Sequence, residues 1–425
     1  MRKGGGLRGL ALHHVRGANR ATVLQLLDRQ QQISRADLAR QTGLSEGTVS
    51  RIVGELIRER LVIERGVENS TGGRPGKRLE LNQSGIHAIG VEIQSWETRI
   101  SVGTLGGRIL EDRSFLTPEN PLKTLDLVSE HIAAIRRRHA ADMFEGVGVA
   151  VRGIVNSATG VLELGSLPAW EGIAIREYLE ASVAGPVVLE NNVRAAALAE
   201  YRHGPADIQN SRSMLFIKID EGIGMGLIFD GHMYFGPHMA AGELGQMVIA
   251  DSPGGGREDR PGCLESLASN PALCERYAQL SGSPYLTKAG ETTARARRIC
   301  HLAMQGDAAA RAALAENCRF LGIGIANAVW ALDADAVIID GVITEAWPLV
   351  VPAIREQFPA GRVFRNFHEL MLRPSSLGSD GTIIGAVATA FSPLFASGHR
   401  AGVKAAPGKR RHAVSSFVTP GTNTG

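Results

Sequence analysis

The stretch from Ile33 to Leu81 reads ISRADLARQTGLSEGTVSRIVGELIRERLVIERGVENSTGGRPGKRLEL, and it decides how the front of the chain folds. Ser34 and Asp37 are spaced as in a capping box, in which a serine side chain accepts a hydrogen bond from a backbone N–H at the start of a helix. Gly43 suits the left-handed turn that ends such a helix, and Ser45 can cap a second helix. The pattern predicts two short helices joined by a tight turn.

The second of these helices has two distinct faces. Its apolar residues repeat at helical spacing and predict a buried face: Val49, Ile52, Val53, Leu56 and Ile57. The opposite face begins at Ser45 and carries Thr48, Ser50 and Arg51. Short polar groups and an arginine near the N-terminus of an exposed helix suit the major groove of DNA. We therefore expect these four residues to contact DNA, with an ordinary small helical bundle as the alternative.

A basic hairpin follows the two helices. Residues 61–63 and 78–81 have strand character, and the segment between them contains several glycines together with Arg74 and Lys77. A flexible basic tip of this kind lies against phosphates or places an arginine in a narrow minor groove. The alternative is a hairpin that only contacts solvent. The residues expected to contact phosphates or the minor groove are Arg35, Arg74, Lys77 and Arg78.

Charge is distributed unevenly along the 425 residues. The chain carries a net charge of +3, but residues 1–82 carry +7, residues 400–425 carry +5, and the middle carries −9. This asymmetry indicates a polyanionic partner for the two ends, and double-stranded DNA is the partner we expect.

Four cysteines show no CxxC pair, which favours a reducing compartment, and we expect the cytoplasm. No run reaches the roughly 20 apolar residues that a membrane span needs, so no membrane partner is expected.

The pattern also predicts the domain organisation. Residues 1–14 and the basic tail 397–425 are rich in glycine or other small residues and are predicted to be disordered. Residues 15–82 form the winged helix-turn-helix domain, with a first helix capped by Asn19. In residues 86–392, strand pairs followed by helices occur twice, which predicts a two-lobed α/β body with a ligand cleft between the lobes.

Several motifs lie in order through this body. They are Gly153-x-x-Asn156 with Leu167-Pro-Ala-Trp170, Glu190-Asn-Asn-Val-Arg-Ala-Ala-Ala-Leu-Ala-Glu200, Glu221-Gly-Ile-Gly-Met-Gly226, Ala241-Gly-Glu-Leu-Gly-Gln246, Pro261-Gly-Cys-Leu-Glu265 and Leu321-Gly-x-x-x-Ala-Asn327. Together they resemble the ROK family, whose members are sugar kinases and sugar-responsive repressors on an actin/Hsp70-like ATPase fold. With the winged segment in front, the chain is similar to the family's repressors of the xylose and N-acetylglucosamine type.

Three departures from the family's kinases bear on activity. The kinases' Asp-x-Gly-Gly-Thr phosphate turn is replaced by Glu92-Ile-Gln-Ser-Trp-Glu-Thr98, so bulk and negative charge stand where glycines cradle phosphate. Asn192 occupies the place of the catalytic aspartate, and an amide cannot accept a proton at neutral pH. Of the zinc ligands only Cys263 remains, since Gln246, Gly256 and Glu258 replace the others, and one thiolate cannot form a tetrahedral site. We expect no metal or cofactor, and a buried Cys263.

The resemblance implies a set of residues for sugar binding: Gly153, Asn191, Asn192, Glu243, Gln246 and Glu265. Carboxylates and amides accept hydrogen bonds from hydroxyl groups, which suits a polyol. Two alternatives remain: Asn191 and Asn192 can simply cap the following helix, and Glu265 can simply start one. The glycine run at 222–226 is interpreted as structural.

These observations predict a transcriptional regulator, in particular a repressor, whose catalytically inactive body senses a sugar or a sugar derivative. A twofold-symmetric operator requires at least a dimer, so a homodimer or homotetramer is expected. One alternative is an active sugar kinase fused to a regulatory segment. The other is a regulator without a small-molecule ligand, constitutive or controlled by a protein partner.

Overall fold

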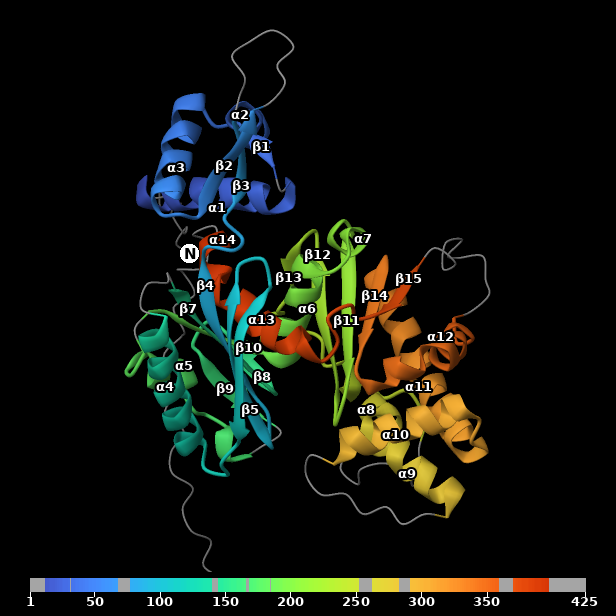
Figure 1. Ribbon diagram of the computed structural model, residues 1–425. Coiled ribbons are helices and arrows are strands. Elements are labelled where there is room, and N and C mark those ends of the chain that lie inside the picture. The colour runs from blue at the N-terminus through green and yellow to red at the C-terminus, as the bar shows by residue number, and fades with distance from the viewer. Residues whose placement is uncertain are drawn as a thin grey trace, which may run out of the picture.

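The computed structural model describes residues 12–30, 32–67, 77–139, 144–165, 168–183, 185–251, 262–282, 291–358 and 370–396. Figure 1 shows a small N-terminal unit above two lobes that lie side by side. The predicted α/β class, with a winged helix-turn-helix in front of a two-lobed body, is confirmed. None of the helices in the described ranges is long and apolar enough to cross a membrane.

The N-terminal unit, called the winged unit below, consists of three helices and a three-stranded sheet in the order β1-β3-β2. Its elements are α1 Leu12–Gln30, β1 Ile33–Ser34, α2 Arg35–Thr42, α3 Glu46–Arg58, β2 Val62–Val67 and β3 Lys77–Leu81. The predicted signals act as expected: the Ser34 side chain accepts from Asp37 N, the Ser45 side chain accepts from Thr48 N, and Gly43 is left-handed with φ 68°. Val49, Ile52, Val53 and Leu56 are buried, and Ile57 is half-buried.

The prediction for the first helix was wrong at its start. Asn19 lies inside α1, which already begins at Leu12. Arg16 pairs with Glu55 of α3 at 2.6 Å, and Arg20 pairs with Glu59, just after α3, at 2.5 Å, so contacts with residues distant in the sequence hold α1 on both sides of Asn19. Of the N-terminus predicted to be disordered, residues 1–14, positions 12–14 instead lie in α1, and positions 1–11 lie outside the described residues. The predicted disordered tail 397–425 and Arg74 in the hairpin tip also lie outside them.

The first lobe is built on a five-stranded mixed sheet in the order β10-β7-β4-β5-β6. Its elements are β4 His87–Ile93, β5 Glu97–Thr104, β6 Ile109–Leu116, α4 Pro121–Arg138, β7 Phe144–Val151, the hairpin β8 Ile154–Asn156 and β9 Val161–Leu164, η1 Pro168–Trp170, α5 Ile175–Glu180 and β10 Val187–Asn191. Alternate residues point to opposite faces. Ile89 and Val91 therefore pack with α4 and α5, while Gly90 faces Ile383 and Val387 on the opposite side of the sheet.

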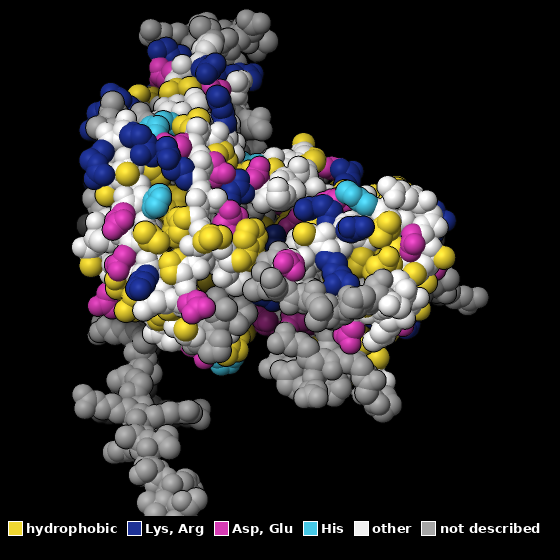
Figure 2. Space-filling view, turned by 60° about the horizontal axis from the view of Figure 1, so that its bottom comes forward, with side chains coloured by type: hydrophobic (Ala, Val, Ile, Leu, Met, Phe, Trp, Pro, Cys, Tyr) yellow, Lys and Arg dark blue, Asp and Glu magenta, His cyan; other side chains and the backbone are white. Residues whose placement is uncertain are grey.

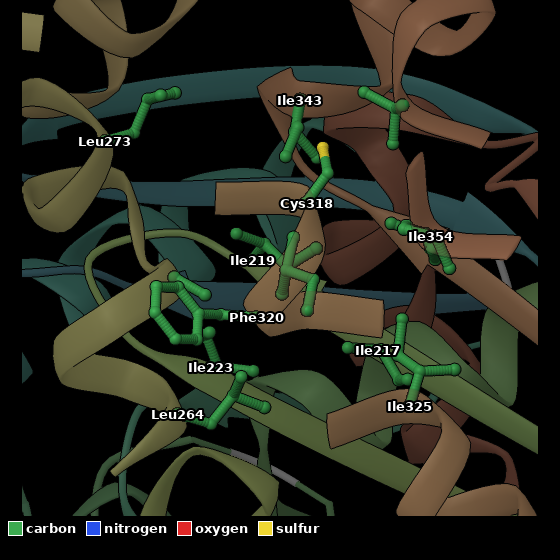
Figure 3. Packing of buried hydrophobic residues seen from close by; sticks show 14 of the residues in the cluster. Ile217, Ile219, Ile223, Leu264, Leu273, Cys318, Phe320, Ile325, Ile343 and Ile354 are labelled. Carbon is green, nitrogen blue, oxygen red and sulfur yellow. The ribbon is translucent and has the colours of Figure 1, made fainter. Parts of the chain in front are cut away.

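The second lobe is built on a sheet in the order β13-β12-β11-β14-β15. Its elements are α7 Ala206–Gln209, β11 Ser213–Ile219, β12 Ile223–Phe229, β13 His232–Met233, η2 Leu244–Gln246, α8 Leu264–Ala268, α9 Asn270–Ser281, α10 Thr292–Gln305, α11 Ala308–Leu332, β14 Ala336–Asp340, η3 Val342–Ala346, α12 Trp347–Arg355 and β15 Met371–Pro374. Figure 3 shows the core between this sheet and its helices, where Ile217 and Ile219 of β11 lie near Cys318 and Phe320 of α11. Met214 and Phe216, on the other face of β11, pack with α6.

Two crossing helices, α6 Asn192–His203 and α13 Gly381–Ala390, join the lobes (Figure 1). Helix α13 covers the first sheet and α6 covers the second, and the two helices pack against each other. Small residues make this closeness possible: a Cβ at Gly148 would lie 1.9 Å from Ala386 O, and one at Gly226 would lie 2.4 Å from Ala197 Cβ. Side chains at these positions would force the layers apart.

The winged unit is seated on both lobes. Short helices η4 Gly378–Asp380 and α14 Ser392–Phe395 flank α13, and α14 contacts α1. Gln25 of α1 donates to Phe395 O at 2.8 Å, and Arg29 donates to Asp230 O in the β12–β13 turn of the second lobe at 3.2 Å. One apolar cluster continues from Leu24 of α1 to Phe391. Because α1 contacts both lobes, a movement of one lobe relative to the other would shift the residues against which α1 packs.

Gly385→Ala tests the close packing of the crossing helices. The new Cβ would lie 2.0 Å from Ala195 O, so α6 and α13 must separate, and we expect a loss of about 1–3 kcal/mol in stability. Gly381→Ala, on the same helix, meets nothing closer than 3.7 Å and is the matched control. Thermal unfolding followed by circular dichroism should show a lower Tm for Gly385→Ala alone. Equal Tm values for the two variants would contradict this packing.

Candidate functional site

The first candidate surface is the solvent-facing side of α3. Ser50 and Arg51 are exposed there, and Thr48 is half-buried with its hydroxyl 2.9 Å from that of Ser45. Arg51 Nη1 lies 3.1 Å from Glu55 Oε1, but the Arg51 side chain is 48% exposed. An exposed pair of this kind contributes little stability, so Arg51 can leave Glu55 at small cost to reach a base.

Two of the predicted phosphate contacts meet at one carboxylate. Glu64 on β2 accepts from Lys77 at 2.6 Å and from Arg35 at 2.7 Å. These hydrogen bonds, first from Lys77 and then from Arg35, lower the pKa of Glu64. Arg78 is exposed on β3. Glu64 therefore reduces the positive charge that the base of the hairpin presents.

The second candidate site is a cavity of about 490 Å³ between the lobes. The β4–β5 turn and Arg152 line it from the first lobe, Asn192 lines it at the start of α6, and residues 218–221 and 340–345 line it from the second lobe. Asn192 is the member of the predicted sugar-binding set that lines this cavity; Gly153, Asn191, Glu243, Gln246 and Glu265 do not.

Asn191 and Asn192 have different environments. Asn191 caps α6, since its Oδ1 accepts from Val193 N and Arg194 N, and its Nδ2 donates to Gly153 O at 2.9 Å. The capping alternative thus describes Asn191 well. Asn192 Oδ1 is buried and has no hydrogen-bond partner among the residues that the structure describes. A buried acceptor without a partner is costly, and a ligand hydroxyl would satisfy it.

The two predicted glutamates differ in their surroundings. Glu265 Oε2 accepts from Ile223 N at 3.1 Å, and Glu265 stands in the first turn of α8, as the helix-start alternative expects. A Cβ at Gly222 would lie 2.6 Å from Glu265 Oε2, which supports a structural role for this glycine. Glu243 is exposed just before η2, and Gln246 ends η2.

A buried ion pair that sequence reasoning missed holds the loop before Glu243. Arg194 Nε donates to Glu190 Oε1 at 2.6 Å, and the remaining guanidinium nitrogens donate to Val155 O and Met239 O. A buried pair is stable only when its remaining donors are satisfied, as they are here. Arg194 therefore positions residues 239–246 relative to α6.

The β4–β5 turn is the stretch predicted to replace the kinase phosphate turn. Gln94 N donates to Glu97 O at 3.0 Å, so a tight turn carries Ser95 and Trp96 into the cavity lining. Glu92 is buried behind the turn, and burial raises the pKa of its carboxyl. The bulk of Trp96 and the nearby acids Glu97 and Glu221 oppose a polyphosphate at this position.

Sequence reasoning also missed the cations of the cleft. Lys218 Nζ lies 2.8 Å from Asp340 Oδ2 and 3.3 Å from Thr382 Oγ1 of α13. Burial alone would lower the pKa of Lys218, but the charges of Asp340 and Glu92 outweigh it and raise that pKa. Arg152 of the first lobe pairs with Glu221 of the second at 3.0 Å, so this ion pair bridges the cleft. A lysine inside the apolar strand MLFIKI was the signal available in the sequence.

The structure describes only part of the region that matches the family's zinc site, where we expected no metal. Cys263 is buried, as predicted, and Gln246 lies near the surface of η2. Positions 256 and 258 fall outside the described residues. Within the described ranges, no three His, Cys, Asp or Glu side chains are grouped to hold a metal ion.

On the face shown in Figure 2, acidic and basic side chains are interspersed over both lobes.

Comparison with known proteins agrees with this geometry. Residues 88–392 match the ROK family, and residues 20–63 match the winged helix-turn-helix DNA-binding family. The chain belongs to the ROK family. Because the DNA-binding match precedes the ROK match, it is a ROK family transcriptional regulator with an N-terminal winged helix-turn-helix.

Similar proteins include regulators and kinases of the ROK family. The chain is 29% identical over 377 residues to a xylose repressor of Bacillus spizizenii, covering 87% of this chain and 94% of the relative. It is 27% identical to the DNA-binding transcriptional dual regulator NagC of Escherichia coli, covering 80% and 84%. The crystal structure of a ROK family regulator homologous to the E. coli MLC protein superposes with a TM-score of 0.77 at 26% identity, covering 91% and 98%. A ROK hexokinase from Thermus thermophilus superposes with a TM-score of 0.60 at 27% identity, covering 72% and 99%.

Glu64→Gln tests whether the winged unit meets DNA through Arg35 and Lys77. Removing the carboxylate frees both cations, so affinity for DNA of any sequence should rise. The slope of log Kd against log salt concentration should steepen by the amount expected for about one additional phosphate contact or more. Fluorescence anisotropy with labelled duplexes over a salt series measures both. Glu80→Gln removes one charge from the same hairpin, where Glu80 pairs with Arg65, and is the control. Equal effects of the two variants would show a general charge effect and contradict the proposed contacts.

Proposed function

We propose that this ROK regulator is a cytoplasmic, sugar-responsive DNA-binding repressor whose body binds a sugar or sugar derivative without phosphorylating it. The β4–β5 turn carries this proposal. It places Trp96 and Glu97 in the cleft where a kinase needs glycines around phosphate. A body that keeps a cavity between its lobes but disfavours phosphate at the β4–β5 turn is suited to sensing a sugar.

The winged unit supports the DNA-binding half of the proposal. Thr48, Ser50 and Arg51 are the proposed base contacts, with Ser45 at the start of the same helix. Arg35, Lys77 and Arg78, together with Arg74 in the hairpin tip, are the proposed phosphate or minor-groove contacts. The helix presents its polar side to solvent while its apolar side is buried, which leaves that polar side available to the major groove.

The cleft supports the sugar-sensing half. Asn192 Oδ1 is a buried acceptor that a sugar hydroxyl would satisfy, and Gly153, Asn191, Glu243, Gln246 and Glu265 are proposed to complete the site. Two of the relatives are named as repressors for xylose and for N-acetylglucosamine. These names support a sugar or amino sugar as effector.

An active kinase is the second candidate function, because the hexokinase fold is shared. Two features oppose it. Asn192 cannot take a proton from a sugar hydroxyl, and the β4–β5 turn opposes polyphosphate. A coupled assay with ATP and a hexose panel separates the candidates, since phosphorylation that Asn192→Ala abolishes would establish the kinase.

The crossing helices provide a physical route between the cleft and the winged unit. Asn192 at the start of α6 lines the cavity, and Arg202 near the end of α6 lies over the Phe395 ring at 4.4 Å and 4.0 Å from Asp28 of α1. Helix η4 begins at Gly378 beside the cavity and leads into α13, which is followed by α14 against α1. We propose that sugar binding changes the angle between the lobes and so the position of α1. In a homodimer or homotetramer this would change the spacing of two winged units on a twofold operator.

DNA recognition is tested by selecting bound sequences from random duplexes with the full chain. We expect a specific sequence to be enriched. Arg51→Ala should weaken binding to that sequence by roughly 1–3 kcal/mol if Arg51 contacts a guanine, with little change on random DNA. Lys77→Ala should weaken binding to both DNAs. No enriched sequence at physiological salt would contradict the DNA-binding function, and equal losses for Arg51→Ala on both DNAs would reassign Arg51 to phosphate.

Arg202→Met tests the route through α6. The variant removes the charge over Phe395, so the sugar should still bind while its effect on DNA affinity, expected at about 5–150-fold in the native protein, becomes smaller. Arg319→Met is the control, because it removes a similar cation–ring contact elsewhere in the protein. Arg319 lies 4.2 Å from the Phe320 ring on α11 of the second lobe. Titrations of selected DNA with and without sugar measure the effect. A full sugar response in Arg202→Met would contradict this route.

A further inference from the structure

The cavity extends well beyond the position of Asn192. Trp96 lies at the tip of the β4–β5 turn, in the stretch predicted to replace the kinase phosphate turn, and lines the same cavity as Asn192. Trp96 is 41% exposed, so an accessible indole is available to a ligand in this cavity. Trp170 contributes a second, buried aromatic wall.

The volume is also larger than one sugar ring requires. At about 490 Å³ the cavity falls in the range of roughly 300–1,000 Å³ that holds drug-sized ligands. Asn192 and Trp96 both line this volume, so a ligand of more than one ring has room to contact both.

The charges of the cavity match one another. Arg152 pairs with Glu221, Lys218 pairs with Asp340, and Arg297 pairs with Glu345 at 2.7 Å. An anionic ligand would have to break such pairs and would meet the remaining carboxylates. A neutral ligand can leave the pairs in place and donate its hydroxyl groups to carboxylate oxygens that still accept hydrogen bonds.

These observations together describe a carbohydrate site. A pyranose ring has apolar C–H faces, which cover an indole, and hydroxyl groups at its edge, which donate to acids and amides. We propose that the cleft binds a neutral saccharide of two or more rings, with one ring at Asn192 and the next stacked on Trp96. This proposal rests on the proposed sugar-sensing function. It assigns the former phosphate half of the cleft to a second sugar subsite.

The test is calorimetric titration of the full chain with matched pairs of probes: xylose and xylobiose, glucose with cellobiose and maltose, and N-acetylglucosamine with N,N′-diacetylchitobiose. We expect at least one disaccharide to bind roughly tenfold tighter than its own monosaccharide, as burial of one apolar ring face would give. Trp96→Ala should abolish this preference and leave monosaccharide binding unchanged. Leu116→Ala, which removes an apolar side chain that is 81% exposed on β6, is the control and should retain the preference.

The outcomes separate the two proposals. If a monosaccharide binds as tightly as its disaccharide and Trp96→Ala changes neither, the second subsite is overturned while sugar sensing stands. If no member of the panel binds the native chain, sugar sensing and the second subsite are both overturned. Equal losses for mono- and disaccharide in Trp96→Ala would place the first ring on Trp96 and overturn the two-ring arrangement.

Discussion

The close contact of α6 with α13 is the constraint on which the rest of the structure depends. Alanines on α6 and alanines and glycines on α13 let backbone approach backbone, and each helix also covers the sheet of one lobe. Because the two helices share their ends with the two functional regions, the same packing holds Asn192 at the cleft and Arg202 beneath α1. Small side chains interdigitate little across the contact. The two helices can therefore slide a short distance past each other more easily than they can separate. That property suits a body that must respond to a ligand and remain folded.

In the proposed function, the cleft of a kinase fold recognises a sugar without transferring a phosphoryl group. Phosphoryl transfer depends on positioning and on positive charge around the phosphates. Here Trp96 fills part of the space, and the cations Arg152 and Lys218 are paired with Glu221 and Asp340. The amide of Asn192 preserves an acceptor without a base. The bulk of Trp96 and the pairing of the cations disfavour a nucleotide, while the cavity keeps polar groups and the aromatic residues Trp96 and Trp170 in its lining, which suits a carbohydrate.

Local signals predicted most of the fold, and distant contacts decided what they missed. Ser34, Gly43 and Ser45 act on neighbouring residues, so the helix-turn-helix could be derived from the sequence. The start of α1 could not, because Arg16 and Arg20 find partners 39 residues away. The same holds for the site: Asn192 was predicted from its motif, whereas Arg152 pairs across 69 residues and Lys218 across 122. The motif also could not separate Asn191, which caps α6, from Asn192, whose oxygen is left without a partner among the described residues.

Coupling between cleft and winged unit is the central claim, and thermodynamic reciprocity tests it most directly. If sugar changes the affinity for DNA, DNA must change the affinity for sugar by the same factor. Calorimetric titration of the sugar into the free protein and into its complex with selected operator DNA measures this factor. The account predicts dissociation constants that differ by about 5–150-fold. Identical constants with and without operator would contradict it.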